Sequence, residues 1–354
     1  MNLFTPAGGL FATHVTWADV EEDMQRELDT VASFGPNKTA KDIGDGKGFM
    51  SKIVLIEPDW QHKDKELPER FIVKMFFMKK FSENNPVKGY MIMEFLENIK
   101  GVHIFENVKP KQVLRNKAVI EANSLSFTDD ERKVFTNSPF SELFGTIFKG
   151  EMLDRFIDVL RAFEGGKLAE KADHLGAILS DLLDFERADH MAEECEMGKV
   201  LCHGDLWSMN VLWRPDEDGE LNLAAVIDYQ TAHFGCAATD LVRLFAACLS
   251  GEDRREHWEG LLEDFYGYLK EEVAEKEMPY TLEQLKEAYK RFLPIGGFLI
   301  VPAIGPLFEV ILKTTDEEYK KKCLETVMEK LECLLDDMFF YHDRNMKIRG
   351  EHRA

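Results

Sequence analysis

The chain has no excess of basic residues and no long, uninterrupted apolar segment. It carries 44 Lys and Arg against 65 Asp and Glu, so the formal net charge of its 354 residues is −21. A nucleic-acid-binding surface needs a basic stripe, which this sequence does not show. We therefore expect no nucleic-acid partner. The acidic surface could steer a cationic substrate, but charge of this kind more often serves solubility.

The six cysteines lack the close pairing of a zinc site, and several lie in apolar segments. This is typical of reduced thiols in a cytoplasmic protein. The first ten residues show no basic region followed by an apolar stretch, so we expect no secretory signal. The most apolar segment, 292–308, contains three prolines and is shorter than the roughly 20 residues that span a bilayer. We expect a buried, kinked helix there and no membrane span.

Short apolar segments surround a polar loop near the middle of the chain. The sequence K-V-L-C-H-G-D-L-W-S-M-N-V-L-W-R is followed, after a turn, by A-A-V-I-D-Y-Q. Strands are expected at 200–202, 211–213 and 223–227, and turn-forming residues at 215–219 predict that the last two strands form a hairpin. Such a hairpin brings Asn210 and Asp228 to the same end of neighbouring strands.

Asp205, Asn210 and Asp228 are the residue types that phosphoryl transfer from ATP requires. A carboxylate orients the attacking hydroxyl and accepts its proton, and further oxygen ligands hold the Mg²⁺ ions that neutralise the phosphates. A tripeptide such as H-G-D also occurs by chance, but here the loop, the hairpin and the later aspartate occur together. We therefore interpret Asp205 as the catalytic base and Asn210 and Asp228 as metal ligands.

The motifs H-G-D-L-W-S-M-N and I-D-Y-Q resemble those of the choline kinase and aminoglycoside phosphotransferase superfamily, and most closely its CHK kinase-like group, which is related to ecdysteroid kinases. Residues 48–60, 67–74, 89–98 and 239–244 are also similar. The resemblance implies an α+β, protein-kinase-like fold of two lobes: a nucleotide-binding lobe at 1–96 and a mainly helical catalytic and substrate lobe at 97–354. It also implies ATP and Mg²⁺ as cofactors and an ecdysteroid-like, choline-like or xenobiotic alcohol as the acceptor.

Two other polar residues accompany the catalytic motifs. His203 is expected to be structural, because phosphoryl transfer gives it no proton to move. Asp240 is expected either to begin a helix or to hold the catalytic loop. A metallohydrolase that uses His203 would need a second histidine cluster, which is missing from the sequence. Aromatic residues of the C-terminal part, such as Trp258 and Phe292, either line a substrate pocket or, more commonly, fill the core.

Periodicity predicts the order of the secondary structure. A helix is expected to begin after Thr16 and to continue through Val31 until Gly35 and Pro36 stop it. Strands are predicted at 49–57, 70–77 and 90–96, a helix at 110–126, and mainly helices at 148–187 and after 240.

The first predicted hairpin carries candidate nucleotide-binding residues. Gly44, Gly46 and Gly48 permit a backbone that donates N–H groups to phosphate, although any flexible hairpin entry could carry such glycines. Lys74 lies between apolar neighbours, so it needs an anionic partner if it points inward. The resemblance implies that Lys74 contacts the ATP phosphates; the alternative is an exposed lysine on one strand face.

The resemblance also implies a hinge at residues 93–96, where the backbone of Glu94 and Leu96 would bind adenine. One departure from the family pattern follows Lys74. Kinases of this kind place a helix with a lysine-pairing glutamate and further strands before the hinge strand, but only 15 residues separate Lys74 from Tyr90. We expect that helix to be absent and the small lobe to be shortened, with an exposed sheet edge. The alternative function is therefore an inactive nucleotide- or ligand-binding pseudokinase.

Overall fold

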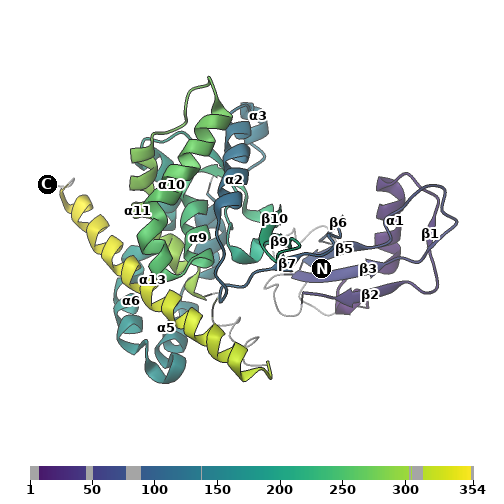
Figure 1. Ribbon diagram of the computed structural model, residues 1–354, viewed down its shortest axis with the longest axis horizontal. Coiled ribbons are helices and arrows are strands. Elements are labelled where there is room, and N and C mark those ends of the chain that lie inside the picture. Colours follow the sequence, from purple (N-terminus) through teal and green to yellow (C-terminus); the bar gives the residue numbers. More distant parts are fainter. Residues whose placement is uncertain are drawn as a thin grey trace. The chain divides into compact units, whose positions relative to one another are not determined.

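The computed structural model describes residues 8–44, 51–76, 89–136, 138–302, 304 and 314–351. The chain divides into two compact units, Met1–Glu97 and Asn98–Ala354. The first unit is rich in strands and the second is mainly helical (Figure 1). This architecture confirms the predicted α+β class.

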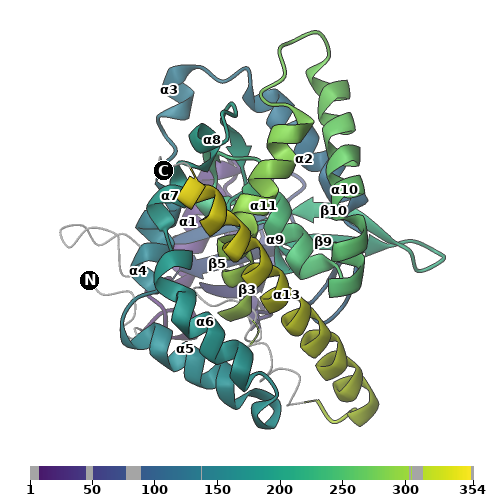
Figure 2. The same ribbon diagram turned by 90° about the vertical axis from the view of Figure 1, so that its left-hand side faces the viewer.

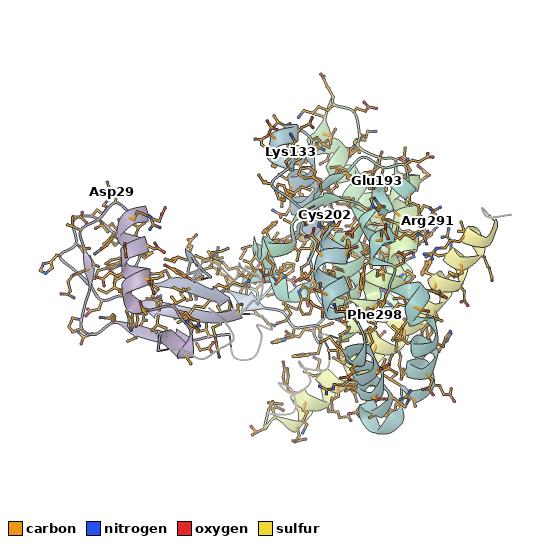
Figure 3. The ribbon with its side chains drawn as sticks, turned by 180° about the vertical axis from the view of Figure 1, so that it is seen from behind. Asp29, Lys133, Glu193, Cys202, Arg291 and Phe298 are labelled. Carbon is orange, nitrogen blue, oxygen red and sulfur yellow. The ribbon has the colours of Figure 1, made fainter. Side chains whose placement is uncertain are left out.

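The first helix begins where the sequence predicts and ends earlier. α1 (Trp17–Glu27) starts at a capping box, in which Thr16 Oγ1 accepts from the Asp19 N–H and the Asp19 carboxylate accepts from the Thr16 N–H. The chain then reverses at Asp29 (Figure 3), whose φ of 47° is left-handed. The prediction that the helix continues through Val31 is therefore wrong, and the Val31 side chain is 78% exposed.

A four-stranded antiparallel sheet forms the centre of the N-terminal unit (Figure 1). Three of its strands were predicted, and the short polar strand β2 was not. The strands, in sheet order, are β2 (Thr39–Asp42), β3 (Ser51–Glu57), β5 (Phe71–Phe76) and β6 (Tyr90–Glu94). A separate two-stranded pair joins β1 (Ser33–Phe34) to β4 (Trp60–Gln61).

One face of this sheet is covered by α1. Val20 and Met24 of α1 belong to the same buried cluster as Val54, Val73 and Met75 of the sheet. Because side chains alternate across a strand, residue 74 lies on the opposite face from its two neighbours on β5. Val73 and Met75 therefore face the apolar cluster under α1, and Lys74 lies on the opposite face of the sheet.

The C-terminal unit consists of helices around two small sheets. β8 (Val200–Cys202) pairs with β11 (His233–Gly235), while β9 (Val211–Pro215) pairs with both β10 (Leu221–Val226) and β7 (Lys100–Gly101). The helices are α2 (Lys111–Ser124), α3 (Asp129–Arg132), α4 (Gly145–Ile147), α5 (Glu151–Ala162), α6 (Ala169–Leu182), α7 (Phe185–Asp189), α8 (Met191–Glu194), α9 (Ala238–Cys248), α10 (Gly251–Val273), α11 (Leu282–Phe298) and α13 (Glu317–Glu351).

Helix α9 lies at the centre of this unit, since every one of its side chains is buried. α2 packs against α10, and α13 runs along α11 and α10 and reaches α6 (Figure 2). Phe265, Phe292 and Phe298 are fully buried, so these aromatic residues fill the core. Pro294 lies inside α11, in the apolar segment predicted to be a buried, kinked helix. Among the described residues, no helix combines the length and apolarity that crossing a membrane requires.

A buried lysine joins α13 to the end of α9. The Lys330 ammonium, 2% exposed, donates to the carbonyl oxygens of Ile104 at 2.7 Å, Ala247 at 2.8 Å and Glu106 at 3.2 Å. Ala247 belongs to the last turn of α9, where a cation also meets the negative end of the helix dipole. Lys330 therefore replaces water as the donor to three carbonyls.

We expect the Lys330→Met variant to lose about 3 kcal/mol of unfolding free energy, because buried carbonyl groups are left without a donor. Urea unfolding followed by circular dichroism measures this loss. Lys322→Met, at an exposed position of the same helix, serves as the control and should change stability by less than about 0.5 kcal/mol. Equal stability of the two variants would contradict this account of Lys330.

Candidate functional site

The predicted hairpin is present and sets the positions of two candidate residues. β9 and β10 pair antiparallel with Val211 opposite Val226, and the Ile227 N–H donates to the Asn210 carbonyl at 2.9 Å. Asn210 and Asp228 therefore lie at the same end of neighbouring strands, as the sequence predicted. This end of the hairpin adjoins the loop that carries Asp205.

Asn210 contacts Asp205 directly. Its amide nitrogen Nδ2 donates to the Asp205 backbone oxygen at 2.8 Å and to the carboxylate oxygen Oδ2 at 3.0 Å. Both partners are acceptors only, which assigns the nitrogen of the amide to this side. The other amide atom, Oδ1, accepts no hydrogen bond from the described residues. Asn210 therefore keeps an oxygen of the kind that binds hard cations.

Asp228 occupies an unusual backbone conformation at the end of β10. Its φ and ψ are 70° and 56°, which is left-handed and uncommon for a residue with a side chain. Such conformations cost about 1–3 kcal/mol and cluster at functional sites, where the surrounding structure holds them. The preceding residue, Ile227, is bonded through both its N–H and its carbonyl, so the strand end that carries Asp228 is fixed.

His203 links the two aspartates through backbone contacts. Its Nε2–H donates to the Ile227 carbonyl at 2.8 Å, and its Nδ1 accepts from the Asp205 N–H at 3.2 Å. Because a carbonyl only accepts, the ring proton is on Nε2 and Nδ1 is the acceptor. The imidazole thus connects the loop with the residue before Asp228, and both of its nitrogens are occupied.

Asp240 holds the backbone at the start of the loop that carries Asp205. Its two carboxylate oxygens accept from the His203 N–H at 2.8 Å and the Gly204 N–H at 2.9 Å. Gly204 has a φ of 81°, and a Cβ there would lie 2.2 Å from the Thr231 carbonyl oxygen. The loop therefore requires glycine at this position. Cys202, the last residue before the loop, is completely buried in the C-terminal unit (Figure 3).

A buried ion-pair network surrounds Asp240. Lys117 Nζ lies 2.8 Å from Asp240 Oδ2 and 2.6 Å from Glu121 Oε1, and the Tyr280 hydroxyl donates to Glu121 Oε2 at 2.5 Å. All four residues are at most 4% exposed. Burial raises the pKa of Asp240, but the Lys117 ammonium and the contacts with His203 together outweigh burial, and the pKa is lowered to about 2. Burial raises the pKa of Glu121 despite the same lysine.

Sequence reasoning missed Lys117, Glu121 and a third residue, Arg243. The Arg243 guanidinium forms an ion pair with the Asp205 carboxylate through Nη2 and Oδ1. Arg243 and Glu121 left a signal, because each is a charged residue between two apolar neighbours, the criterion that identified Lys74. Lys117 follows Asn116 and left no such signal. Arg243 follows Asp240 by three residues, so both belong to one side of α9.

The nucleotide-binding candidates belong to the N-terminal unit. Lys74 lies on β5 between Ile53 of β3 and Met91 of β6, and it is 7% exposed, so it is not the exposed lysine of the alternative interpretation. Glu94 is the last residue of β6, and Leu96 follows it.

The glycine-rich segment is described in part. Gly44 follows β2, and its N–H donates to the Asp42 carboxylate at 3.0 Å, which in turn pairs with Lys52 at 2.7 Å. Gly46 and Gly48 lie outside the described residues. The backbone N–H of Gly44 is thus already hydrogen-bonded within its own turn.

Comparison with known proteins identifies the family. The DUF1679 family model, described as "Uncharacterized oxidoreductase dhs-27", matches residues 3–76 and 72–346. The chain belongs to this family. The Caenorhabditis elegans protein "Uncharacterized oxidoreductase dhs-27" is 26% identical over 258 residues, which are 68% of this chain and 30% of that protein. The C. elegans "Uncharacterized kinase-like protein D1044.1" is 28% identical over 152 residues, which are 41% of this chain and 39% of that protein.

The matched part of this DUF1679 chain thus spans well under two thirds of each curated relative. Among solved structures, a choline kinase from Cryptosporidium parvum Iowa II has a TM-score of 0.48 at 14% identity and covers 84% of this chain and 90% of its own. An ethanolamine kinase from Plasmodium vivax has a TM-score of 0.48 at 13% identity, with 94% and 90% covered. The family match and the kinase-like relative agree with the superfamily resemblance expected from the sequence.

Removing the charge of Asp240 is expected to destabilise the unit that carries the loop. In Asp240→Asn, Lys117 loses one of its two carboxylate partners, and breaking a buried pair in this way costs about 3–5 kcal/mol. Because the pKa of Asp240 lies below its ordinary value of 3.8, the stabilisation is complete above about pH 4 and is lost as the pH falls through about 2.

Urea unfolding of the wild type and Asp240→Asn between pH 7 and pH 2.5 measures this difference. Asp264→Asn, at an exposed position of α10, controls for the loss of one negative charge. A stability difference that stays constant across this pH range would show that the ionised Asp240 carboxylate is not the stabilising group.

Proposed function

We propose that this DUF1679 chain is an ATP- and Mg²⁺-dependent phosphotransferase that acts on a hydroxyl group of a small molecule. The observation that carries the proposal is the convergence of Asp205, Asn210 and Asp228 at one end of the β9–β10 hairpin. A carboxylate, an amide oxygen and a second carboxylate in that order match the roles that phosphoryl transfer needs.

Asp205 is the proposed catalytic base. Its backbone N–H is bonded to His203 Nδ1, and its carboxylate is held by Asn210 and Arg243, so the side chain is ordered before any substrate binds. An ordered carboxylate can orient the acceptor hydroxyl and take its proton. Most of the rate enhancement in phosphoryl transfer comes from such positioning together with charge neutralisation.

Asn210 and Asp228 are the proposed metal ligands. No group of three or more His, Cys, Asp or Glu suited to a metal occurs in the described part of the chain. Mg²⁺ does not require such a cage, because it commonly keeps several waters and binds through one or two carboxylates and the nucleotide phosphates. The available amide oxygen of Asn210 and the carboxylate of Asp228 fit this ligand set. When bound, the ion would neutralise the phosphate oxygens.

The remaining assignments follow from the resemblance and the buried position of Lys74. Lys74 is proposed to contact the ATP phosphates, Gly44, Gly46 and Gly48 to close over them, and the backbone of Glu94 and Leu96 to bind adenine. The acceptor is proposed to be an ecdysteroid-like, choline-like or xenobiotic alcohol. A cytoplasmic location is proposed because all six cysteines are free and five are buried.

Turnover should depend on Asp205. We expect the wild type to transfer phosphate from Mg-ATP to at least one member of a panel of sterols, amino alcohols and other alcohols, and Asp205→Ala to be slower by about 10²- to 10⁴-fold. Labelled γ-phosphate appearing on the acceptor is the readout. Asp218→Asn, an exposed aspartate in the turn of the same hairpin, should retain wild-type turnover. Absence of transfer to every acceptor, by a chain that binds Mg-ATP, would exclude the proposal.

A second candidate function is an inactive, nucleotide- or ligand-binding protein. β5 and β6 are direct neighbours in the sheet, with Lys74 opposite Met91 and Met75 opposite Tyr90. In addition, the family model matches the chain in two segments that overlap at residues 72–76, within β5. Both observations concern the part of the chain between the Lys74 strand and the next strand. This is where related kinases place the lysine-pairing helix. Loss of that ion pair would leave nucleotide binding without efficient transfer.

Calorimetry separates the two functions. Under the phosphotransferase proposal, Asp228→Asn should weaken Mg-ATP binding by about tenfold, through loss of one charged ligand worth about 1.4 kcal/mol, and should also abolish transfer. Omission of Mg²⁺ should have the same effect on the wild type. Tight Mg-ATP binding with no transfer would instead support the inactive protein. Asp218→Asn again controls for charge.

A further inference from the structure

Helix α9 contacts the catalytic loop through two charged residues one helical turn apart. Asp240 accepts hydrogen bonds from the backbone of His203 and Gly204, and Arg243 forms an ion pair with the side chain of the next residue, Asp205. Residues three apart lie on the same side of a helix, so both contacts come from one surface of α9. The helix therefore holds both the backbone and the carboxylate.

Arg243 makes little use of its hydrogen-bonding capacity. The residue is 4% exposed, and Nη2 has Asp205 as its partner, whereas Nε and Nη1 are buried and have no hydrogen-bond partner among the described residues. Its guanidinium also lies 6.0 Å from the centre of the Phe144 ring. A buried charge with unmet donors is unfavourable, and replacing a whole buried ion pair by apolar residues of similar size is often neutral or stabilising. Stability alone therefore does not explain an arginine here.

The contacts of Arg243 and Asn210 are complementary. Arg243 forms an ion pair with Asp205 Oδ1, and Asn210 Nδ2 donates a hydrogen bond to Asp205 Oδ2 at 3.0 Å. With both oxygens anchored from different elements, rotation of the carboxylate is prevented. A carboxylate has about four lone-pair sites, so two anchors still leave acceptor capacity for a substrate hydroxyl.

We propose that Arg243 is a positioning residue that fixes the Asp205 carboxylate in the orientation required to accept the hydroxyl proton. The proposal rests on the phosphotransferase function given above. Arg243 acts through Asp205 and not on the substrate. A planar guanidinium holds the carboxylate plane in a way that the point charge of lysine cannot.

The chain contains a matched control for this arginine. Arg254 on α10 is 1% exposed, donates through Nη2 to Asp337 Oδ2 at 2.6 Å, and also has Nε and Nη1 buried without a partner among the described residues. Its partner Asp337 belongs to α13 and, within the described part of the chain, forms ion pairs with Arg254 and Arg255 and not with the loop that carries Asp205. Arg254 is thus as buried as Arg243 and also pairs with one aspartate through Nη2, but it does not contact Asp205.

The experiment compares Arg243→Met, Arg243→Lys and Arg254→Met in the full chain, with Mg-ATP and the best acceptor of the alcohol panel. We expect Arg243→Met to lower kcat by about 10²-fold, the size expected from a misplaced catalytic group, while the Kd for Mg-ATP measured by calorimetry stays within about twofold. Arg243→Lys should recover only part of kcat. Arg254→Met should keep wild-type kcat.

Chemical rescue provides a readout that a purely structural role would not change. Added guanidinium at low millimolar concentration, below that which denatures proteins, should raise kcat of Arg243→Ala and leave Arg243→Met and Asp205→Asn unchanged. If Arg243→Met does not fold, kcat of the wild type is compared with kcat of Arg243→Lys and of Arg243→Ala with and without guanidinium. Urea unfolding of the Asp205→Asn, Arg243→Met and double variants should show non-additive losses, which measures the ion pair without any turnover.

Wild-type kcat in Arg243→Met would overturn the inference while leaving the phosphotransferase function intact, and an increase in kcat would show that Arg243 restrains Asp205 instead of positioning it. An equal loss of kcat in Arg254→Met would assign the effect to stability and also overturn the inference. If the wild type transfers no phosphate at all, the proposed function fails and the inference fails with it, even where the unfolding experiments confirm the ion pair.

Discussion

The conformation of the loop that carries Asp205 depends on the carboxylate of Asp240. This group lies in the interior of the C-terminal unit. It accepts hydrogen bonds from the N–H groups of His203 and Gly204, the two residues immediately before Asp205. A buried carboxylate is favourable only when its charge is compensated, and Lys117 supplies that charge at 2.8 Å. The position of Asp205 is therefore determined by a buried ion pair between α2 and α9.

The network around this ion pair joins elements that are distant in the sequence. Lys117 and Glu121 come from α2, Asp240 from α9, and Tyr280 from the segment before α11. If all three charged groups are ionised, the network carries one net negative charge. Burial raises the pKa of Glu121 in spite of Lys117 and of the hydrogen bond that Tyr280 donates. Removing one partner from such a network leaves an uncompensated buried charge, so each of these residues depends on the others.

The sequence allowed the principal site residues to be predicted because their positions depend on local patterns. The turn at 215–219 and the apolar strands on either side determine the hairpin, and the hairpin determines the proximity of Asn210 and Asp228. Arg243 and Lys117 depend on which faces of α9 and α2 meet the loop, and this is set by tertiary packing that periodicity does not reveal. The end of α1 was missed for a different reason, since the left-handed turn at Asp29 has no glycine to announce it.

The shortened connection after Lys74 concerns only one part of the proposed reaction. The contacts described here for Asp205 come from Asn210, His203 and Arg243, all within the C-terminal unit. None of them depends on the residues between β5 and β6. A change in the N-terminal unit would therefore leave the contacts of Asp205 unchanged, whatever its effect on the proposed contact of Lys74 with nucleotide phosphates. The phosphotransferase and the inactive nucleotide-binding protein therefore have the same contacts around Asp205. They differ in whether Lys74 can be positioned without the paired glutamate, whose expected place, between β5 and β6, lies outside the described residues.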